Sequence, residues 1–259
     1  MNIAVLGAGA MGGALASGLI DYGDGKYNLA IANPTAEKLE RFADSGAFTT
    51  TDNVQAISGS EVVVIAVKPW VLPDVIDEIK DAMDYEAQSV IVIAAGVCSD
   101  RLREMFDRES ELPEIVLAMP NTAMSVRQSM TFLVAVNSEN AFVESASAMF
   151  GCLGSTMVID EKHLPAATAL ASCGIAYAMR YVRAAVEGGV ELGFRASEAQ
   201  AMILQTLTGA VALLEQPGAH PESEIDKVTT PGGLTIRGLN EMERQGFTNA
   251  VISGLKASR

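Results

Sequence analysis

Short apolar runs alternate with longer mixed segments over the first 160 residues of the chain. Two of these runs, at residues 61–67 and 89–94, are rich in valine and isoleucine without polar alternation, which is typical of parallel strands buried on both faces. Further strands are predicted at residues 3–6, 28–32, 115–119, 131–136 and 156–159. Because helical patterns separate the strands, notably at residues 14–20, 34–42 and 71–83, the sequence predicts a doubly wound α/β sheet.

The pattern changes near residue 160, where strand signals end and the chain becomes rich in alanine. Long helices are predicted at residues 165–192 and 197–215, and a shorter pair follows. Ser197-Glu198-Ala199-Gln200 has the composition of a capping box at the start of the second long helix. We therefore predict a Rossmann-type domain at residues 1–159 and a helical domain at residues 160–259.

The N-terminal segment joins a strand to a helix through Gly7-Ala8-Gly9-Ala10-Met11-Gly12. In such a turn Gly7 permits the sharp bend, Gly9 lets the backbone approach a pyrophosphate, and Gly12 lets the helix pack closely on the sheet. Unpaired N–H groups and the dipole at the helix start favour a bound phosphate. A lone GxGxxG is a weak signal, but its place between a buried strand and a helix predicts a dinucleotide site.

The residue at the end of the second predicted strand bears on which nicotinamide nucleotide is bound. NAD-specific sites place Asp or Glu there, and this carboxylate would repel a 2′-phosphate. This chain has Asn33, with Thr35 and Lys38 in the following turn, where they could contact a phosphate. Asn33 could equally serve only as a helix cap before Pro34. The neutral side chain favours NADPH, with NADH as the alternative.

Charge and hydropathy narrow the class of partner. The 259 residues are 49% hydrophobic and carry a formal net charge of −14, which argues against nucleic acid or an anionic membrane surface as a partner. The longest apolar stretch, at residues 164–179, is interrupted by Pro165 and Gly174. It is too short to cross a bilayer.

Cysteine usage and the N-terminus bear on the cellular compartment. Cys98, Cys152 and Cys173 lack the spacing of metal ligands, so no metal site is expected, and reduced thiols suit the cytoplasm. Met1 leads directly into a strand without a basic region, so no signal peptide is predicted.

A second informative segment, residues 226–236, reads Asp-Lys-Val-Thr-Thr-Pro-Gly-Gly-Leu-Thr-Ile. A proline and two glycines before a hydroxyl residue at a helix start can form a nest of N–H groups suited to a carboxylate. The same residues also fit a simple turn between helices with a threonine cap. The segment alone leaves both interpretations open.

Together the two segments resemble the pyrroline-5-carboxylate reductase family, over essentially the whole chain. The residues that carry the resemblance are the glycine turn, Asp52-Asn53, Ala66-Val67-Lys68-Pro69, Ala94-Ala95-Gly96, Met119-Pro120-Asn121-Thr122, Met130-Thr131, Ala176-Tyr177, Glu187-Gly188-Gly189-Val190 and, most specifically, residues 228–236. The resemblance implies a Rossmann domain and an all-α C-terminal dimerisation domain that interlocks with a partner subunit. It also implies NAD(P)H-dependent reduction of the cyclic imine 1-pyrroline-5-carboxylate to L-proline, the last step of proline biosynthesis.

Three features indicate which residues bind cofactor and substrate: the glycine turn, the uncharged Asn33 at the end of the second predicted strand, and the motifs shared with the family. Cofactor-binding residues are expected to be Gly7, Gly9, Ala10, Met11, Gly12, Asn33, Thr35, Asn53, Ala66, Val67, Lys68, Pro69, Ala95, Gly96 and Asn121. Substrate-binding residues are expected to be Thr230, Gly232, Gly233, Leu234 and Thr235. By the resemblance, the backbone at Gly233 and Leu234 holds the substrate carboxylate, and the catalytic residue Thr235 bonds the ring nitrogen.

The implied chemistry agrees with the scarcity of acid–base groups. If the imine enters protonated, no strong general acid is needed, and positioning supplies most of the rate. The only histidines, His163 and His220, suit surface or loop positions. The alternatives are a related reductase acting on another imine or a hydroxyacid, and a non-catalytic dinucleotide-binding regulator. Hydroxyacid enzymes of this kind need a helix lysine, and the chain has none between Lys162 and Lys227.

The chain departs from the family at several positions. Residues 171–175, Ala-Ser-Cys-Gly-Ile, stand where Ser-Gly-Ser-Gly-Pro is usual. Without that proline and one glycine, we expect a straighter helix. Ala123, Ser129 and Arg183 stand where a proline, a glycine and an acid are common. The departures leave substrate identity and catalytic efficiency open.

The first long helix also bears on assembly. From Pro165 to Val186 its only charged residues are Arg180 and Arg183, so the helix is apolar nearly all round and must be buried on most of its surface. One helical domain has too few other helices to cover it. A second copy could supply the cover through a two-fold interface, so we predict a stable homodimer at least.

Overall fold

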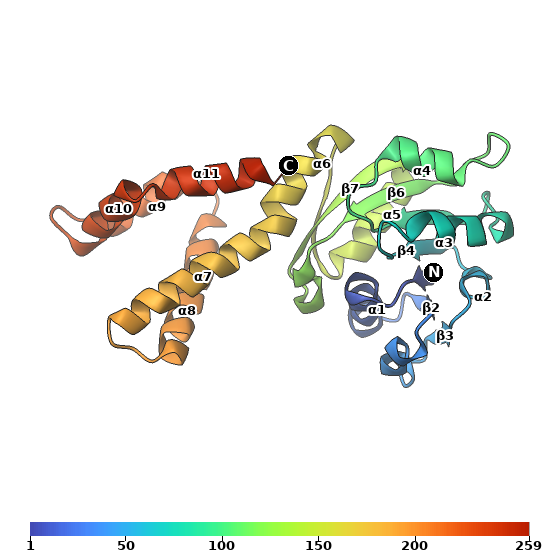
Figure 1. The fold of residues 1–259 in the computed structure, drawn as a ribbon, viewed down its shortest axis with the longest axis horizontal. Helices are drawn as coiled ribbons and strands as arrows, with labels where there is room; N and C mark the ends of the chain where they lie inside the picture. Colours follow the sequence, from blue (N-terminus) through green and yellow to red (C-terminus); the bar gives the residue numbers. More distant parts are fainter. Residues whose placement is uncertain (259) are drawn as a thin grey trace. The chain divides into compact units, whose positions relative to one another are not determined.

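The computed structural model describes residues 1–258. These residues form two compact units, which divide between Ser172 and Cys173 (Figure 1). The first unit contains a single eight-stranded sheet. Its strands are β1 (Asn2–Leu6), β2 (Asn28–Ala32), β3 (Phe48–Thr50), β4 (Val62–Ile65), β5 (Ser89–Val92), β6 (Ile115–Met119), β7 (Ser129–Asn137) and β8 (Gly154–Val158). The doubly wound α/β fold predicted from the sequence is confirmed.

The strand order places a ligand crevice beside the glycine turn. The strands run β3-β2-β1-β4-β5-β6-β7-β8, and all neighbouring pairs are parallel except β6 and β7. From β1 the chain proceeds to β2 on one side and returns to β4 on the other, so the order reverses between β1 and β4. Ligands of open α/β sheets bind at the carboxyl ends of the strands at this point.

Helices cover both faces of the sheet. On one face lie α1 (Ala10–Tyr22) and α5 (Asn140–Gly151), and on the other lie α2 (Asn53–Ile57), α3 (Leu72–Ile79) and α4 (Ser99–Phe106). In β4, Val62 and Val64 pack on the face that α1 and α5 cover, while Val63 and Ile65 pack on the face that α2, α3 and α4 cover. The uninterrupted apolar run of β4 therefore reflects burial on both faces.

The helix predicted at residues 34–42 is wrong. Two 3₁₀ turns, η1 (Ala36–Lys38) and η2 (Glu40–Phe42), occupy this segment. Thr35 is extended, with φ of −101° and ψ of 105°, so helical structure starts late. The first bonds then run from each N–H to the carbonyl three residues back, as from Lys38 to Thr35, which closes tighter turns than an α-helix.

The predicted long helix at residues 165–192 is present, but it is not regular. It begins as α6 (Leu164–Ala167), passes through a π-helical turn at Thr168–Ser172, and continues as α7 (Cys173–Glu191). The straighter helix expected from the lost proline and glycine is therefore wrong at its start. Residues before Cys173 belong to the first unit because Leu164 and Ala167 are buried in its core. That unit thus extends past the predicted boundary at residue 159.

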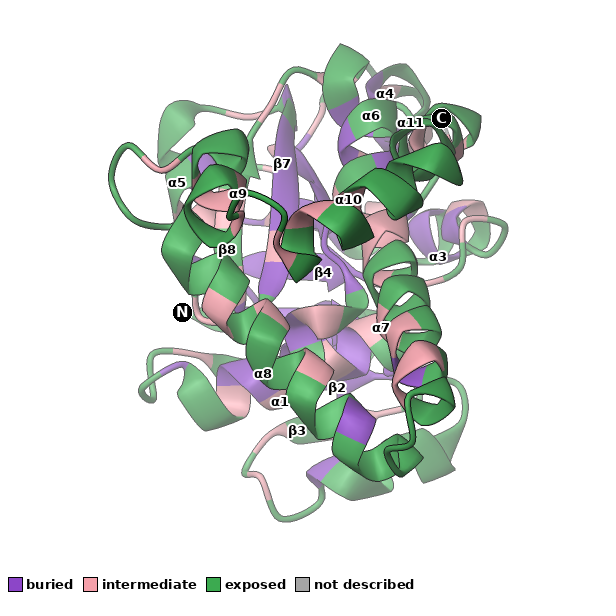
Figure 2. Cartoon of the chain, turned by 90° about the vertical axis from the view of Figure 1, so that its left-hand side faces the viewer, coloured by how far each residue is buried: buried purple, intermediate pink, exposed green. Residues whose placement is uncertain are grey.

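The remaining helices of the second unit are α8 (Ala196–Leu214), α9 (Pro221–Val228), α10 (Leu234–Arg244) and α11 (Phe247–Ala257). The predicted capping box at Ser197 is wrong, because the residue that precedes α8 is Arg195, whose N–H donates to Glu198 Oε2 at 3.0 Å. Of the described residues in this unit, only Val186 and Ala199 are buried (Figure 2). An isolated copy of this unit thus has almost no core of its own.

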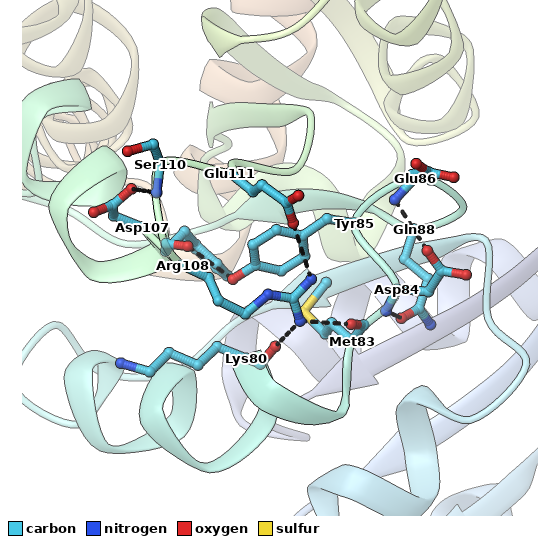
Figure 3. A network of polar contacts seen from close by, with 11 residues as sticks. Lys80, Met83, Asp84, Tyr85, Glu86, Gln88, Asp107, Arg108, Ser110 and Glu111 are labelled. Carbon is cyan, nitrogen blue, oxygen red and sulfur yellow. Dashed lines mark hydrogen bonds and ion pairs between the residues drawn. The ribbon is translucent and has the colours of Figure 1, made fainter.

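A polar cluster clamps two loops where β5 and β6 begin (Figure 3). The Arg108 guanidinium donates to the carbonyls of Lys80 and Met83 at 3.2 and 3.0 Å and lies 4.1 Å from the centre of the Tyr85 ring. Burial raises the pKa of Tyr85 above its usual value, an effect that Arg108 opposes. The protonated phenol donates to the Phe106 carbonyl at 2.8 Å. Because these strand ends lie opposite the glycine turn, the cluster is structural.

Candidate active site

The glycine turn sits where the sheet order reverses, and two of its glycines are required by the backbone. Gly7 has a φ of +103°, and a Cβ there would lie 2.6 Å from the Ala66 carbonyl oxygen. A Cβ on Gly12 would lie 2.0 Å from the Gly7 carbonyl oxygen and 2.7 Å from the Ala66 Cβ. The turn therefore packs directly on the end of β4, as the motif predicts.

Gly9 has a different role from its neighbours. A Cβ at Gly9 would meet no atom within 4 Å, so the protein itself does not require a glycine here. Gly9 is the N-cap of α1, and no described side chain caps this helix start. The first N–H groups of the helix, including those of Ala10 and Met11, therefore face space that a phosphate can fill.

The neutral side chain at the end of β2 braces the turn. Asn33 is 5% exposed, its Oδ1 accepts from the Ala8 N–H at 3.1 Å, and its Nδ2 donates to the Thr35 carbonyl at 3.0 Å. The interpretation of Asn33 as a helix cap is wrong, because the residue before η1 is Thr35. Asn33 instead ties the end of β2 to the glycine turn.

A cavity of about 300 Å³ lies beside the turn, within the first unit. It is lined by Met11, Val67, Lys68, Pro69, Ile93, Ala94, Ala95, Met119, Pro120, Asn121, Thr122, Thr168 and Ser172. These residues come from the start of α1, from the carboxyl ends of β4, β5 and β6 with the loops that follow them, and from the π-helical turn. Six residues predicted to bind cofactor are thus brought together, and the largely apolar lining suits one ring of a dinucleotide.

Two predicted cofactor residues make contacts within the protein. Asn121, which is buried, accepts from the Ala123 N–H at 3.0 Å and donates to the Ala171 carbonyl at 3.4 Å. It therefore ties the loop after β6 to the segment before α7. Asn53 lies at the start of α2, and its Nδ2 donates to Glu78 Oε2 at 2.8 Å.

The family departures near the cavity have local explanations. The Ser129 hydroxyl, where a glycine is common, accepts from the Asn121 N–H at 3.2 Å. The Ser172 hydroxyl donates to the Pro120 carbonyl at 3.5 Å. Arg183 pairs with Glu187 at 2.8 Å on the surface of α7. The first two departures add hydrogen bonds that hold the cavity wall.

The predicted substrate residues lie in the second unit, at the turn between α9 and α10. Gly232 has a φ of +71°, and Gly233 is the N-cap of α10, with its own N–H bonded to the Thr230 carbonyl at 2.9 Å. The interpretation of Thr235 as a cap is wrong, since no described side chain caps α10. Thr235 is exposed, and Leu234 is 85% exposed. The N–H groups of this first turn suit a carboxylate.

The remaining ionisable groups give no acid–base machinery at these two places. His220 precedes α9 and its Nδ1 accepts from the Glu222 N–H at 3.3 Å, a capping role. Among residues 1–258 no cluster of three His, Cys, Asp or Glu side chains could hold a metal ion. In the same range, no helix is long and apolar enough to cross a membrane.

Sequence reasoning missed Arg41. This residue lies in η2, and its guanidinium reaches the glycine turn, where it donates to the Ala8 carbonyl at 3.1 Å. The one indication in the sequence was that Arg41 is a second basic residue, three positions after Lys38. Because residues 34–42 were predicted to form a regular helix, nothing placed Arg41 near the glycine turn.

Comparison with known proteins decides the family. A family model described as pyrroline-5-carboxylate reductase dimerisation matches residues 161–259, and one described as NADP oxidoreductase coenzyme F420-dependent matches residues 2–96. Pyrroline-5-carboxylate reductase 2 of Dictyostelium discoideum is 35% identical over 99% of this chain and 90% of its own length. This chain belongs to the pyrroline-5-carboxylate reductase family. Reductase 1 of the same organism is 40% identical over 99% of this chain, which spans 48% of that longer protein.

Solved structures of the family agree over the full chain. A pyrroline-5-carboxylate reductase from Coxiella burnetii superposes with a TM-score of 0.90 at 29% identity, covering 99% of this chain and 95% of that one. The reductase of Plasmodium falciparum, with NADP bound, gives 0.87 at 25% identity, covering 100% and 95%. The family reduces 1-pyrroline-5-carboxylate to proline with NAD(P)H, and its dimerisation domain indicates self-association. The predicted family, enzyme class and NADP cofactor are confirmed.

Proposed function

We propose that this chain reduces 1-pyrroline-5-carboxylate to L-proline with NADPH as the preferred donor. The observation that carries the proposal is the glycine turn packed on β4, beside a cavity lined by the ends of three strands. NADPH, when bound, supplies the hydride to the imine carbon. The pyrophosphate would lie on the first turn of α1, and Ala66, Ala95 and their neighbours would line the nicotinamide half. The uncharged Asn33 supports NADPH over NADH.

The turn before α10 would hold the substrate. The N–H groups of Leu234 and Thr235 are suited to the carboxylate, and Gly232 and Gly233 shape the turn that presents them. The Thr235 hydroxyl makes no hydrogen bond to any described residue, so it is free to bond the ring nitrogen as the amine forms. With a protonated imine the protein need not supply a strong acid. The substrate turn then acts mainly by positioning.

The active protein is proposed to be a homodimer or an assembly of dimers, in which helices of one subunit complete the site of the other. The apolar helix α7 and the near absence of buried residues in the second unit support this proposal. Free Cys98, Cys152 and Cys173 support a reducing cytoplasm as its location.

The direct test is NADPH oxidation by the purified protein with pyrroline-5-carboxylate. We expect saturable, substrate-dependent oxidation, and slower turnover with NADH at equal concentration. A parallel assay of NADP reduction with 3-hydroxy acids tests the hydroxyacid alternative, for which we expect no turnover. A folded protein that binds NADPH but never reduces pyrroline-5-carboxylate would support the non-catalytic alternative instead.

A further inference from the structure

A 2′-phosphate needs a cation, and Asn33 cannot supply one. Both ends of its amide are already used, toward Ala8 and toward Thr35. The neutrality of Asn33 explains why a phosphate is not repelled, but attraction requires charged or multiple N–H donors. Whatever binds the phosphate must therefore come from a neighbouring segment.

Arg41 brings such a donor to the glycine turn from a different segment of the chain. Its Nη2 donates to the Ala8 carbonyl at 3.1 Å and also lies 3.5 Å from the Gly9 carbonyl oxygen. A Cβ on Gly13 would fall 1.2 Å from this nitrogen. The guanidinium thus lies against the first turn of α1, in space that a side chain at residue 13 would occupy.

The Arg41 guanidinium lies beside an aromatic ring, and no carboxylate of the described residues pairs with it. The guanidinium lies 4.6 Å from the ring of the adjacent Phe42, which is fully buried. Within residues 1–258, Arg101, Arg103 and Arg108 pair with carboxylates, whereas Arg41 is in none of the ion pairs. Its only hydrogen bonds there go to main-chain carbonyls, through one of the three guanidinium nitrogens. The other N–H groups of the fork remain for an anion.

We propose that Arg41 binds the 2′-phosphate of NADPH and sets the preference of this chain for NADPH. In dinucleotide-binding sheets the adenosine ribose lies at the end of β2 and the pyrophosphate on the start of α1. Arg41 reaches the turn from the β2 side and contacts Ala8, the residue that Asn33 braces. This inference rests on the proposed cofactor but not on the proposed substrate.

The test compares two nucleotides that differ only in the 2′-phosphate: adenosine 2′,5′-bisphosphate and adenosine 5′-phosphate. Binding to the full-length protein without cofactor is measured by calorimetry at an ionic strength of about 0.15 M, where exposed charges are screened within about 8 Å. Arg41→Met removes the charge but keeps an unbranched side chain. We expect it to weaken bisphosphate binding about tenfold or more, the scale of a lost hydrogen bond to a charged group, and to leave the monophosphate nearly unchanged.

Lys38→Met is the matched control, because it removes a charge of the same sign from the same loop. We expect it to weaken bisphosphate binding by less than about threefold, because the exposed Lys38 side chain makes no hydrogen bond to the glycine turn and the charge of an exposed side chain is largely screened at this ionic strength. Equal losses for both nucleotides in the Arg41 variant would place the guanidinium on the 5′-phosphate side and overturn the assignment. Unchanged bisphosphate binding would also overturn it.

The melting temperature of each protein without nucleotide shows whether folding is affected. If Arg41→Met lowers the melting temperature, Arg41→Lys is the variant that tests the proposal, because it keeps the positive charge but lacks the forked guanidinium group. We expect Arg41→Lys to weaken bisphosphate binding relative to monophosphate binding, but by a smaller factor than Arg41→Met. An equal effect of Arg41→Lys on the two nucleotides would overturn the proposal. A protein that loses only bisphosphate binding yet never reduces pyrroline-5-carboxylate would refute the proposed function alone.

Discussion

At the residue scale, Gly9 and Gly12 belong to one motif but have opposite surroundings. Gly12→Ala would push a methyl group into the Gly7 carbonyl and the Ala66 Cβ, so we expect destabilisation of about 1–3 kcal/mol. At Gly9 a methyl group meets nothing, and its φ of −71° suits alanine. Gly9→Ala should therefore fold normally but lose about tenfold or more in NADPH affinity, because about 1.4 kcal/mol of lost contact is a factor of ten.

Thermal unfolding and calorimetric titration with NADPH separate these two effects. Each variant serves as the control for the other. If Gly9→Ala binds NADPH as tightly as the unmodified protein, then the pyrophosphate does not lie against this residue.

Thr235 offers a second test at this scale. Its hydroxyl makes no hydrogen bond to any described residue, so Thr235→Ala should leave the free energy of unfolding and the NADPH dissociation constant nearly unchanged. We expect kcat/KM for pyrroline-5-carboxylate to fall by roughly tenfold or more, as for the loss of a hydrogen bond of about 1.5 kcal/mol. Thr235→Ser keeps the hydroxyl and should retain most of the activity. Steady-state kinetics that are identical for wild type and Thr235→Ala would remove Thr235 from the site.

The sequence predicts glycine positions better than side-chain contacts. Gly7 and Gly12 follow from a backbone rule that any strand-to-helix turn of this kind obeys. Asn33 and Arg41 do not, because their roles depend on which segments meet in space. The sequence correctly placed Asn33 at the strand end, but it could not show that both ends of the amide are bonded.

At the scale of elements, the Arg108 cluster joins two loops that are distant from the cofactor turn. Arg108→Ala would leave the carbonyls of Lys80 and Met83 without their donor. We expect a loss of about 1–3 kcal/mol in the free energy of unfolding and no change in NADPH affinity. Tyr85→Phe removes only the bond to the Phe106 carbonyl, so its loss should be smaller. Denaturant titration of both variants checks this order, and equal stability of Arg108→Ala and wild type would contradict it.

The elements that the sequence predicted well are those with a single dominant signal. The strand at residues 28–32 agrees with the structure at both ends, and β4 and β5 lie within their predicted ranges, because burial on both faces leaves a continuous apolar run. The short edge strand β3 carries no such signal. The π-helical turn at Thr168–Ser172 was also not predictable, since its i to i+5 bonds leave no periodic pattern in the sequence.

At the scale of the whole molecule, the second unit exposes apolar side chains that a stable protein would cover. Most of α7 and α8 is exposed or half-buried (Figure 2). Exposed apolar residues on these helices include Met179, Tyr181, Leu204, Val211 and Leu213. The family model for dimerisation spans this unit. In a single copy these positions stay exposed although α9, α10 and α11 are present. A second copy carries the same apolar surface and can cover it through a two-fold axis.

Two exposed methionines make this argument testable. Met179 on α7 is 65% exposed, and Met157 on β8 is 51% exposed. A glutamate at an interface that buries helices on this scale would bring an unpaired charge out of water, which costs several kcal/mol. We therefore expect Met179→Glu to convert a stable dimer into monomers or insoluble protein, with loss of activity. Met157→Glu should remain dimeric and active, because it lies outside the dimerisation segment. Light scattering coupled to size exclusion measures both, and an active monomer of the unmodified protein at micromolar concentration would refute the proposed assembly.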